Sequence, residues 1–247
     1  MKRRIFKAVS LFLLFFTFAA VLLIPASAEE SENISIQVPD MSQSMQLLIL
    51  LTVLSVAPSI ILLMTSFARI AIVFSFVRSG LGLQQTPPNQ VLIGLALFLS
   101  LFIMMPVASQ VNEEAYQPYK NGEITQTEAY QRAIRPLRTF MLKQTNKQEM
   151  KLFLSLSGED TVEDYDDIPT EALIPAFVLS ELKKAFIMGF MILIPFLIID
   201  MVVASALMSM GMIMVPPAVI ALPFKLILFV VIDGWNLVVK TLLMSFS

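Results

Sequence analysis

Two apolar runs that meet at a methionine-rich loop constrain the fold of this chain more than any other feature. Residues 185–207 contain a single charge, Asp200, and residues 218–239 contain only Lys225 and Asp233. An α-helix needs about 20 apolar residues to cross the ~30 Å hydrocarbon core of a bilayer. Each run is long enough to do so, and the two runs therefore predict a helical hairpin in a membrane protein.

The loop of this hairpin is rich in methionine instead of the polar residues that turns usually contain. It reads Met208-Ser209-Met210-Gly211-Met212-Ile213-Met214-Val215-Pro216-Pro217. Residues two apart do not share a face of a helix, so the alternating methionines cannot all pack in the same way. The pattern favours a deformable apolar collar that a ring of subunits projects into a central pore. The alternative is core packing, because Met201, Met208 and Met212 fall on one helical face.

The composition is that of an integral membrane protein and excludes several classes of site. Of the 247 residues, 57% are hydrophobic and 15% are charged, whereas soluble domains carry about 25% charged residues. The net charge of -2 argues against a nucleic-acid partner, because phosphate binding needs a clustered basic surface. The chain has no cysteine and no histidine, which excludes disulfides, Ser-His-Asp catalysis and histidine or thiolate metal sites. We therefore predict that the protein is not an enzyme and holds no cofactor.

The N-terminus is typical of a secretory signal peptide. A basic start and an apolar stretch precede Pro25-Ala26-Ser27-Ala28, so cleavage is expected between Ala28 and Glu29. An uncleaved anchor is the alternative, because the apolar stretch is long. The predicted segments are a signal peptide at 1–28, an exterior tail at 29–40, a helical hairpin at 41–108, a polar helical region at 109–172 and a second hairpin at 173–247.

All the predicted elements are helices, because no alternating strand pattern occurs. Helix starts are indicated by Asp40 with Gln43, by Thr125 with Glu128, and by Asn146 with Glu149. The expected helices are 41–77 with a kink at Pro58, 91–107, 126–143, 146–156, 170–208 and 218–239. Six of the nine residues at 159–167 are acidic, but they lack the spacing of a calcium-binding loop, so a solvated linker is favoured.

Four charged residues lie inside apolar runs, where charges are costly and usually mark a function or a partner. Arg69 has two interpretations: it extends to the cytoplasmic interface, which we favour, or it pairs with a buried carboxylate in an assembly. Lys225 and Asp233 are too far apart on one helix to touch. Each therefore needs a partner, such as Asp200, Glu181 or another subunit. An ion pair between helices is favoured over a proton relay.

Five motifs of this sequence closely resemble those of the FliP family, the flagellar type III export-gate proteins whose injectisome counterpart is SctR. The motifs are Thr86-Pro87-Pro88-Asn89-Gln90, Phe196-Leu197-Ile198-Ile199-Asp200, Met210-Gly211-Met212-Ile213-Met214-Val215-Pro216-Pro217, Ala221-Leu222-Pro223-Phe224-Lys225 and Asp233-Gly234-Trp235. The resemblance extends over essentially the whole mature chain. The signal peptide favours the flagellar branch of the family.

The resemblance implies a core subunit of the flagellar type III protein-export gate, required for flagellum assembly. It implies a homo-oligomer of about five copies that assembles with FliQ-like and FliR-like subunits. Together they would form a conical channel for unfolded flagellar proteins, in the bacterial inner membrane at the flagellar basal body. The helices need not then span the bilayer as their hydropathy suggests.

The resemblance also assigns roles to individual residues. Glu181 and Lys225 would pair between neighbouring subunits. The other functional class that the charges allow is an ion-coupled secondary transporter or ion channel, with Asp200, Lys225 and Asp233 as a relay. The gasket that closes the pore would consist of Met208, Met210, Gly211, Met212, Ile213, Met214, Pro216 and Pro217.

Overall fold

Every regular element that the computed structural model describes is a helix, so the predicted all-α fold is confirmed. The chain divides into two compact units, Met1–Leu63 and Met64–Ser247, which are described separately. The predicted signal peptide, exterior tail, Asp40 cap and acidic linker, together with Ile213, lie outside the described residues. The structure describes residues 43–83, 85–158, 168–212 and 214–246.

The described part of the first unit is a single apolar helix, α2 (Gln43–Leu63). Large apolar side chains along it are exposed, among them Leu51 at 67% and Ile60 at 46%. Pro58 lies inside α2, and the helix continues past it for a further turn. Among the described residues of this unit, α2 has no other helix to pack against, and an apolar helix exposed in this way needs an apolar surface around it.

The predicted continuous helix from residue 41 to 77 is wrong. α2 ends at Leu63 and α3 begins at Phe67. Thr65 Oγ1 accepts the backbone N–H of Phe67 at 3.3 Å, and Ser66 Oγ donates to Ser100 Oγ at 3.0 Å. Hydroxyl side chains offer the backbone an alternative to helical hydrogen bonds, so the helix is interrupted here instead of at Pro58.

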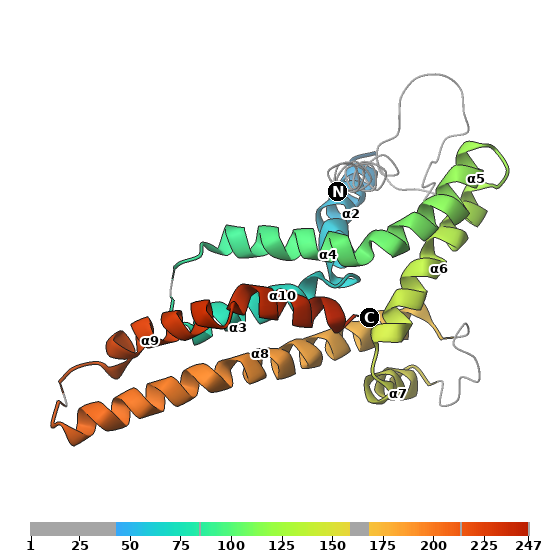
Figure 1. Ribbon diagram of the computed structural model, residues 1–247. Coiled ribbons are helices and arrows are strands. Elements are labelled where there is room, and N and C mark those ends of the chain that lie inside the picture. Colours follow the sequence, from blue (N-terminus) through green and yellow to red (C-terminus); the bar gives the residue numbers. More distant parts are fainter. Residues whose placement is uncertain (1–42, 84, 159–167, 213, 247) are drawn as a thin grey trace. The chain divides into compact units, whose positions relative to one another are not determined.

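The second unit is organised by the packing of α3 (Phe67–Gly80) along α8 (Thr170–Ser209), as Figure 1 shows. Ile70, Phe74 and Val77 of α3 are fully buried at 0% exposure, and their spacing places them on one helical face. The 40-residue α8 agrees with the unbroken helix predicted at 170–208. These two helices carry the core against which the rest of the unit packs.

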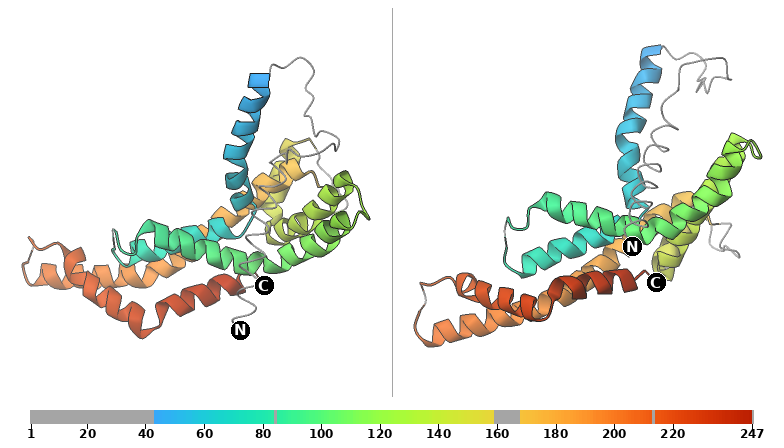
Figure 2. Two further views of the ribbon diagram at one scale, coloured as in Figure 1. Left: turned by 90° about the horizontal axis from the view of Figure 1, so that it is seen from above. Right: turned by 45° about the horizontal axis from the view of Figure 1, so that its top comes forward.

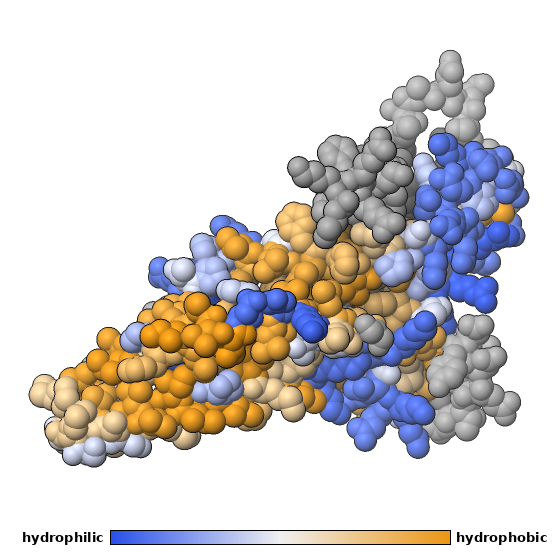
Figure 3. Space-filling view, in the orientation of Figure 1, coloured by the Kyte–Doolittle hydropathy of each residue, from blue (hydrophilic) through white to orange (hydrophobic). Residues whose placement is uncertain are grey.

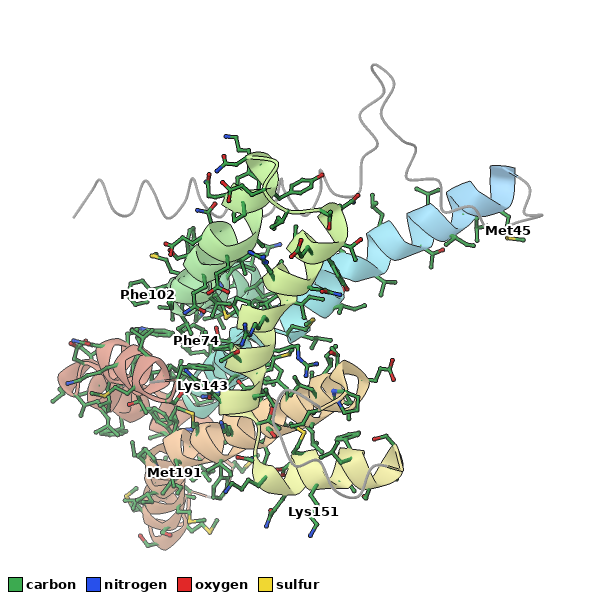
Figure 4. All side chains as sticks on the ribbon, turned by 90° about the vertical axis from the view of Figure 1, so that its right-hand side faces the viewer. Met45, Phe74, Phe102, Lys143, Lys151 and Met191 are labelled. Atoms are coloured by element: carbon green, nitrogen blue, oxygen red, sulfur yellow. The ribbon has the colours of Figure 1, made fainter. Side chains whose placement is uncertain are left out.

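Three further helices complete this apolar bundle: α4 (Asn89–Val111), α9 (Pro217–Val231) and α10 (Gly234–Met244). Phe74 lies within the bundle, whereas Phe102 of α4 and Met191 of α8 point outward, at 60% and 65% exposure (Figure 4). Large apolar side chains thus lie on the outer surface of the bundle as well as in its core.

A polar part continues from α4 through a π-helical turn, η1 (Asn112–Tyr116), into α5 (Gln117–Lys120), α6 (Gln126–Gln144) and α7 (Lys147–Leu156). Hydrophilic residues gather over this part, and hydrophobic ones over the bundle (Figure 3). The Thr125 side chain accepts the backbone N–H of Glu128, so the predicted N-cap is confirmed. Gly158 follows α7 with φ +80°, a conformation that favours glycine.

Among the described residues of the second unit, two helical stretches are long and apolar enough to cross a membrane, Asn89–Lys120 and Thr170–Ser209. α9 and α10 would make a third if they form one span, but they are bent by 61° (Figure 2). The prediction of a single helix at 218–239 is therefore wrong. The bend lies at Asp233, whose φ of 51° takes the backbone out of the right-handed helix.

Gly189 is expected to be essential to the α3–α8 contact. A Cβ atom there would lie 2.3 Å from Cδ2 and 2.5 Å from Cγ of Phe76. Rotation of the ring about its Cβ–Cγ bond would not relieve this clash, because Cγ lies on the rotation axis. We expect Gly189→Ala to destabilise the protein by about 1–3 kcal/mol, measured by SDS-induced unfolding in detergent micelles. Gly94→Ala in α4 is the matched control, because no atom lies within 4 Å of the added Cβ. Equal stability of the two variants would contradict this packing.

Candidate functional site

The methionine-rich loop connects α8 to α9, and its first residues form a turn that ends α8. The N–H of Met212 donates to the Leu207 carbonyl at 3.0 Å, and the N–H of Gly211 to the Met208 carbonyl at 3.0 Å. With Gly211 at φ +74°, these two bonds form a Schellman motif that ends α8. Pro216 and Pro217 then start α9, where proline suits the first helical turn.

The described methionines of this loop are exposed. Met208 is 67% exposed, Met210 64%, Met212 43% and Met214 96%. Met201, which falls on the helical face of Met208 and Met212, is 68% exposed. Packing of these methionines in a core of this chain, the alternative interpretation of the pattern, is therefore wrong. The loop lies at one end of the bundle (Figure 1), and its described methionines are exposed there.

Arg69 is fully buried at 0% exposure, so the prediction that it extends to the membrane interface is wrong. Its Nε donates to Glu181 Oε2 at 2.8 Å, and its Nη2 donates to Glu181 Oε1. This bidentate pair joins α3 to α8 within one chain, and its side chains are 1% exposed. A buried guanidinium needs such a partner, because an unpaired charge in a low-dielectric core is strongly destabilising.

Further polar groups surround this pair, and together they form what we call the Arg69 cluster. Lys184 Nζ donates to the Gln144 carbonyl at 2.7 Å and lies 4.0 Å from Glu181 Oε1. Gln144 Oε1 accepts Arg69 Nη2 at 3.0 Å. The members are Arg69, Gln144, Glu181, Lys184, Ser245 and Phe246. The cluster therefore connects α3, α6, α8 and the segment after α10.

Lys225 of α9 pairs with Asp200 of α8, Nζ to Oδ2 at 2.6 Å. The Lys225 side chain is 7% exposed and that of Asp200 36%. This is one of the partners that the sequence analysis considered for Lys225. The other Asp200 oxygen, Oδ1, is buried without a hydrogen-bond partner. Asp233 is exposed and accepts a hydrogen bond from Asn236 Nδ2 at 3.0 Å.

Glu181 and Lys225 do not pair with each other within the chain. Each already has a partner, Arg69 for Glu181 and Asp200 for Lys225. To pair between neighbouring subunits, Glu181 and Lys225 would each have to leave the partner that they have within their own chain. The inter-subunit pair therefore stays a prediction.

One more ion pair joins α7 to α8 in the polar part. Lys183 Nζ lies 2.8 Å from Glu149 Oε1, and the backbone N–H of Asn146 donates to Ser180 Oγ at 3.0 Å. The hydrogen bond from Lys183 lowers the pKa of the Glu149 carboxyl below its usual value. Glu149 therefore remains charged at neutral pH and helps to fix α7 on α8.

The sequence matches the FliP family over residues 50–242. It is 54% identical over 220 residues to the flagellar biosynthetic protein FliP of Bacillus subtilis, covering 89% of this chain and 96% of that protein. The chain belongs to the FliP family. FliP of Borreliella burgdorferi is 51% identical over 206 residues, covering 82% of this chain and 81% of that protein. FliP of Pectobacterium carotovorum is 51% identical over 203 residues, covering 82% and 79%.

The FliP-family region includes the methionine loop and both partners of each buried ion pair, but it ends before two members of the Arg69 cluster. Gln144, Ser245 and Phe246 were not predicted as site residues from the sequence. Gln144 lies at the polar end of an amphipathic helix, and Ser245 and Phe246 follow the last apolar run. No local pattern marks such residues, because their roles depend on contacts with Arg69, 75 or more positions away in sequence.

Proposed function

We propose that this chain is a core subunit of the flagellar type III protein-export gate and is required for flagellum assembly. Membership of the FliP family and relatives named as flagellar biosynthetic proteins support this proposal. About five copies assemble with FliQ-like and FliR-like subunits in the bacterial inner membrane, at the flagellar basal body. Unfolded flagellar proteins pass through the channel that the subunits enclose.

The exposed methionine loop is the observation that carries the channel part of the proposal. Met214 is 96% exposed and Met210 64%, although both are apolar. A pore that passes unfolded chains but holds back ions needs an apolar constriction that adapts to different side chains. Methionine suits this role because it is unbranched and polarizable. Loops from several copies form the gasket, with Ile213 contributing an apolar side chain between the methionines.

The buried charges act in holding the subunit together and not in a relay. Arg69 pairs with Glu181 and Lys225 with Asp200, which fixes α3 and α9 on α8. The chain performs no catalysis, because a sequence without histidine or cysteine lacks the usual nucleophile-activating groups. The signal peptide directs the N-terminus across the membrane and is cleaved between Ala28 and Glu29.

The proposal is tested by deleting the gene and measuring flagellar hook and filament proteins in the culture medium. We expect these proteins to disappear from the medium while general secretion, the control, is unchanged. Expression of the intact chain should restore them. Normal export of hook and filament proteins by the deletion strain would refute the proposed function.

A further inference from the structure

All five N–H donors of the Arg69 guanidinium have acceptors, and one short segment supplies two of them. Nε and Nη2 bond to Glu181, and Nη2 also bonds to Gln144 Oε1. Nη1 donates to the Ser245 backbone carbonyl at 3.1 Å and to the Ser245 hydroxyl at 2.8 Å. Arginine has five such donors and no acceptor. The buried guanidinium is thus fully satisfied only while Ser245 is in place.

Phe246 covers the same guanidinium from one face. Its ring centroid lies 3.7 Å from Arg69 Cζ, within the range of a cation–π interaction. The ring also stacks against Phe140 of α6, with centroids 6.3 Å apart and planes at 17°. Gln144 Nε2 donates to the Phe246 carbonyl at 3.3 Å. The segment after α10 therefore has both polar and apolar contacts in the Arg69 cluster.

α10 contacts the core along one side. Gly234, Val238 and Leu242 form a buried stripe, with Val239 and Leu243 half-buried beside it, while the other residues of the helix are exposed. At its start, the Trp235 ring packs edge-on against Phe229, with centroids 5.3 Å apart. The preceding Asp233 has a left-handed backbone with φ 51°, at the 61° bend between α9 and α10. The helix is therefore held along one side and at its two ends.

We propose that the Arg69 cluster is a docking site for the chain's own Ser245–Phe246 segment, which latches α10 to α3, α6 and α8. Undocking lets α10 rotate about the bend at Asp233. The docked and undocked states are distinct because undocking leaves Arg69 Nη1 without its acceptors. Water must then enter to satisfy these donors. This proposal concerns one chain and does not depend on the export function.

The latch is tested by the distance between two spin labels in the purified full chain. The chain has no cysteine of its own, so Tyr130→Cys in α6 and Lys240→Cys in α10 provide unique and exposed labelling sites. The labelled parent, mixed with a large excess of unlabelled chain so that distances within one chain dominate, should give one narrow distance distribution in double electron–electron resonance. Adding Ser245→Ala and Phe246→Ala should raise the ratio of displaced to docked α10 by about tenfold or more.

Two comparisons make this test specific. Thr241→Ala with Met244→Ala is the matched control, because both residues are exposed on α10, and it should keep the narrow distribution. Arg69→Lys keeps a positive charge near Glu181 but removes the donors that reach Ser245. It changes the other partner of the contact and should therefore also raise the displaced fraction of α10. If the double variant loses helix content by circular dichroism, Ser245→Ala alone replaces it, with the same expected direction. An unchanged narrow distribution in a folded latch variant would overturn the proposal.

Discussion

Glu181→Leu is expected to destabilise the isolated protein by about 3–5 kcal/mol, because it leaves a buried arginine without its counter-charge. The Arg69 and Glu181 side chains are 1% exposed, so water cannot replace the lost carboxylate without opening the core. Lys184, whose Nζ lies 4.0 Å from Glu181 Oε1, would add repulsion. The measurement is the free energy of unfolding by SDS titration in detergent micelles.

Two variants separate this effect from a general loss of a carboxylate. Glu171→Leu makes the same substitution at an exposed position in the first turn of α8, and should cost less than about 1 kcal/mol. Arg69→Met combined with Glu181→Leu replaces the pair with apolar side chains and should recover part of the stability. A Glu181→Leu protein as stable as the Glu171→Leu control would mean that the buried pair contributes nothing.

Replacing Met210, Met212 and Met214 together with alanine is expected to make the cell membrane leaky to ions while the assembly still forms. Each substitution removes three heavy atoms from a side chain that is 43–96% exposed in the chain. Such positions contribute little to the fold, so stability should change by less than about 0.5 kcal/mol per site. The constriction, by contrast, would widen and no longer exclude water and ions. Ion conductance of the membrane is the measurement.

The matched control replaces three exposed methionines outside the loop: Met191, Met201 and Met244, at 65%, 68% and 64% exposure. It removes the same number of heavy atoms from exposed methionine side chains but leaves the loop intact. Conductance should therefore stay at the level of the parent. Unchanged conductance in the loop variant, with normal amounts of assembled protein, would refute the gasket.

Much of the helical framework could be predicted from local sequence. The 40-residue α8 was expected from an apolar run without an internal break, and the start of α6 from the Thr125 cap. Both signals act over a few residues, through helical periodicity and through hydrogen bonds to the first backbone N–H groups. Of the two errors in helix continuity, the one at Thr65–Ser66 occurred where no proline or glycine marks the break. At Asp233, Gly234 directly follows the break, but the apolar run continues on both sides of it.

The sequence by itself determined that this protein is an all-helical membrane protein with a methionine-rich loop between two apolar helices. Those properties follow from composition and from spacing along one helix. Only the tertiary structure decided that the described methionines of the loop are exposed and how the buried charges pair. Arg69 and Glu181 are 112 positions apart, and Arg69 and Ser245 are 176 apart. Such partners are selected by the packing of α3, α6 and α8 around one desolvated guanidinium, and this packing depends on the whole core and not on any local pattern.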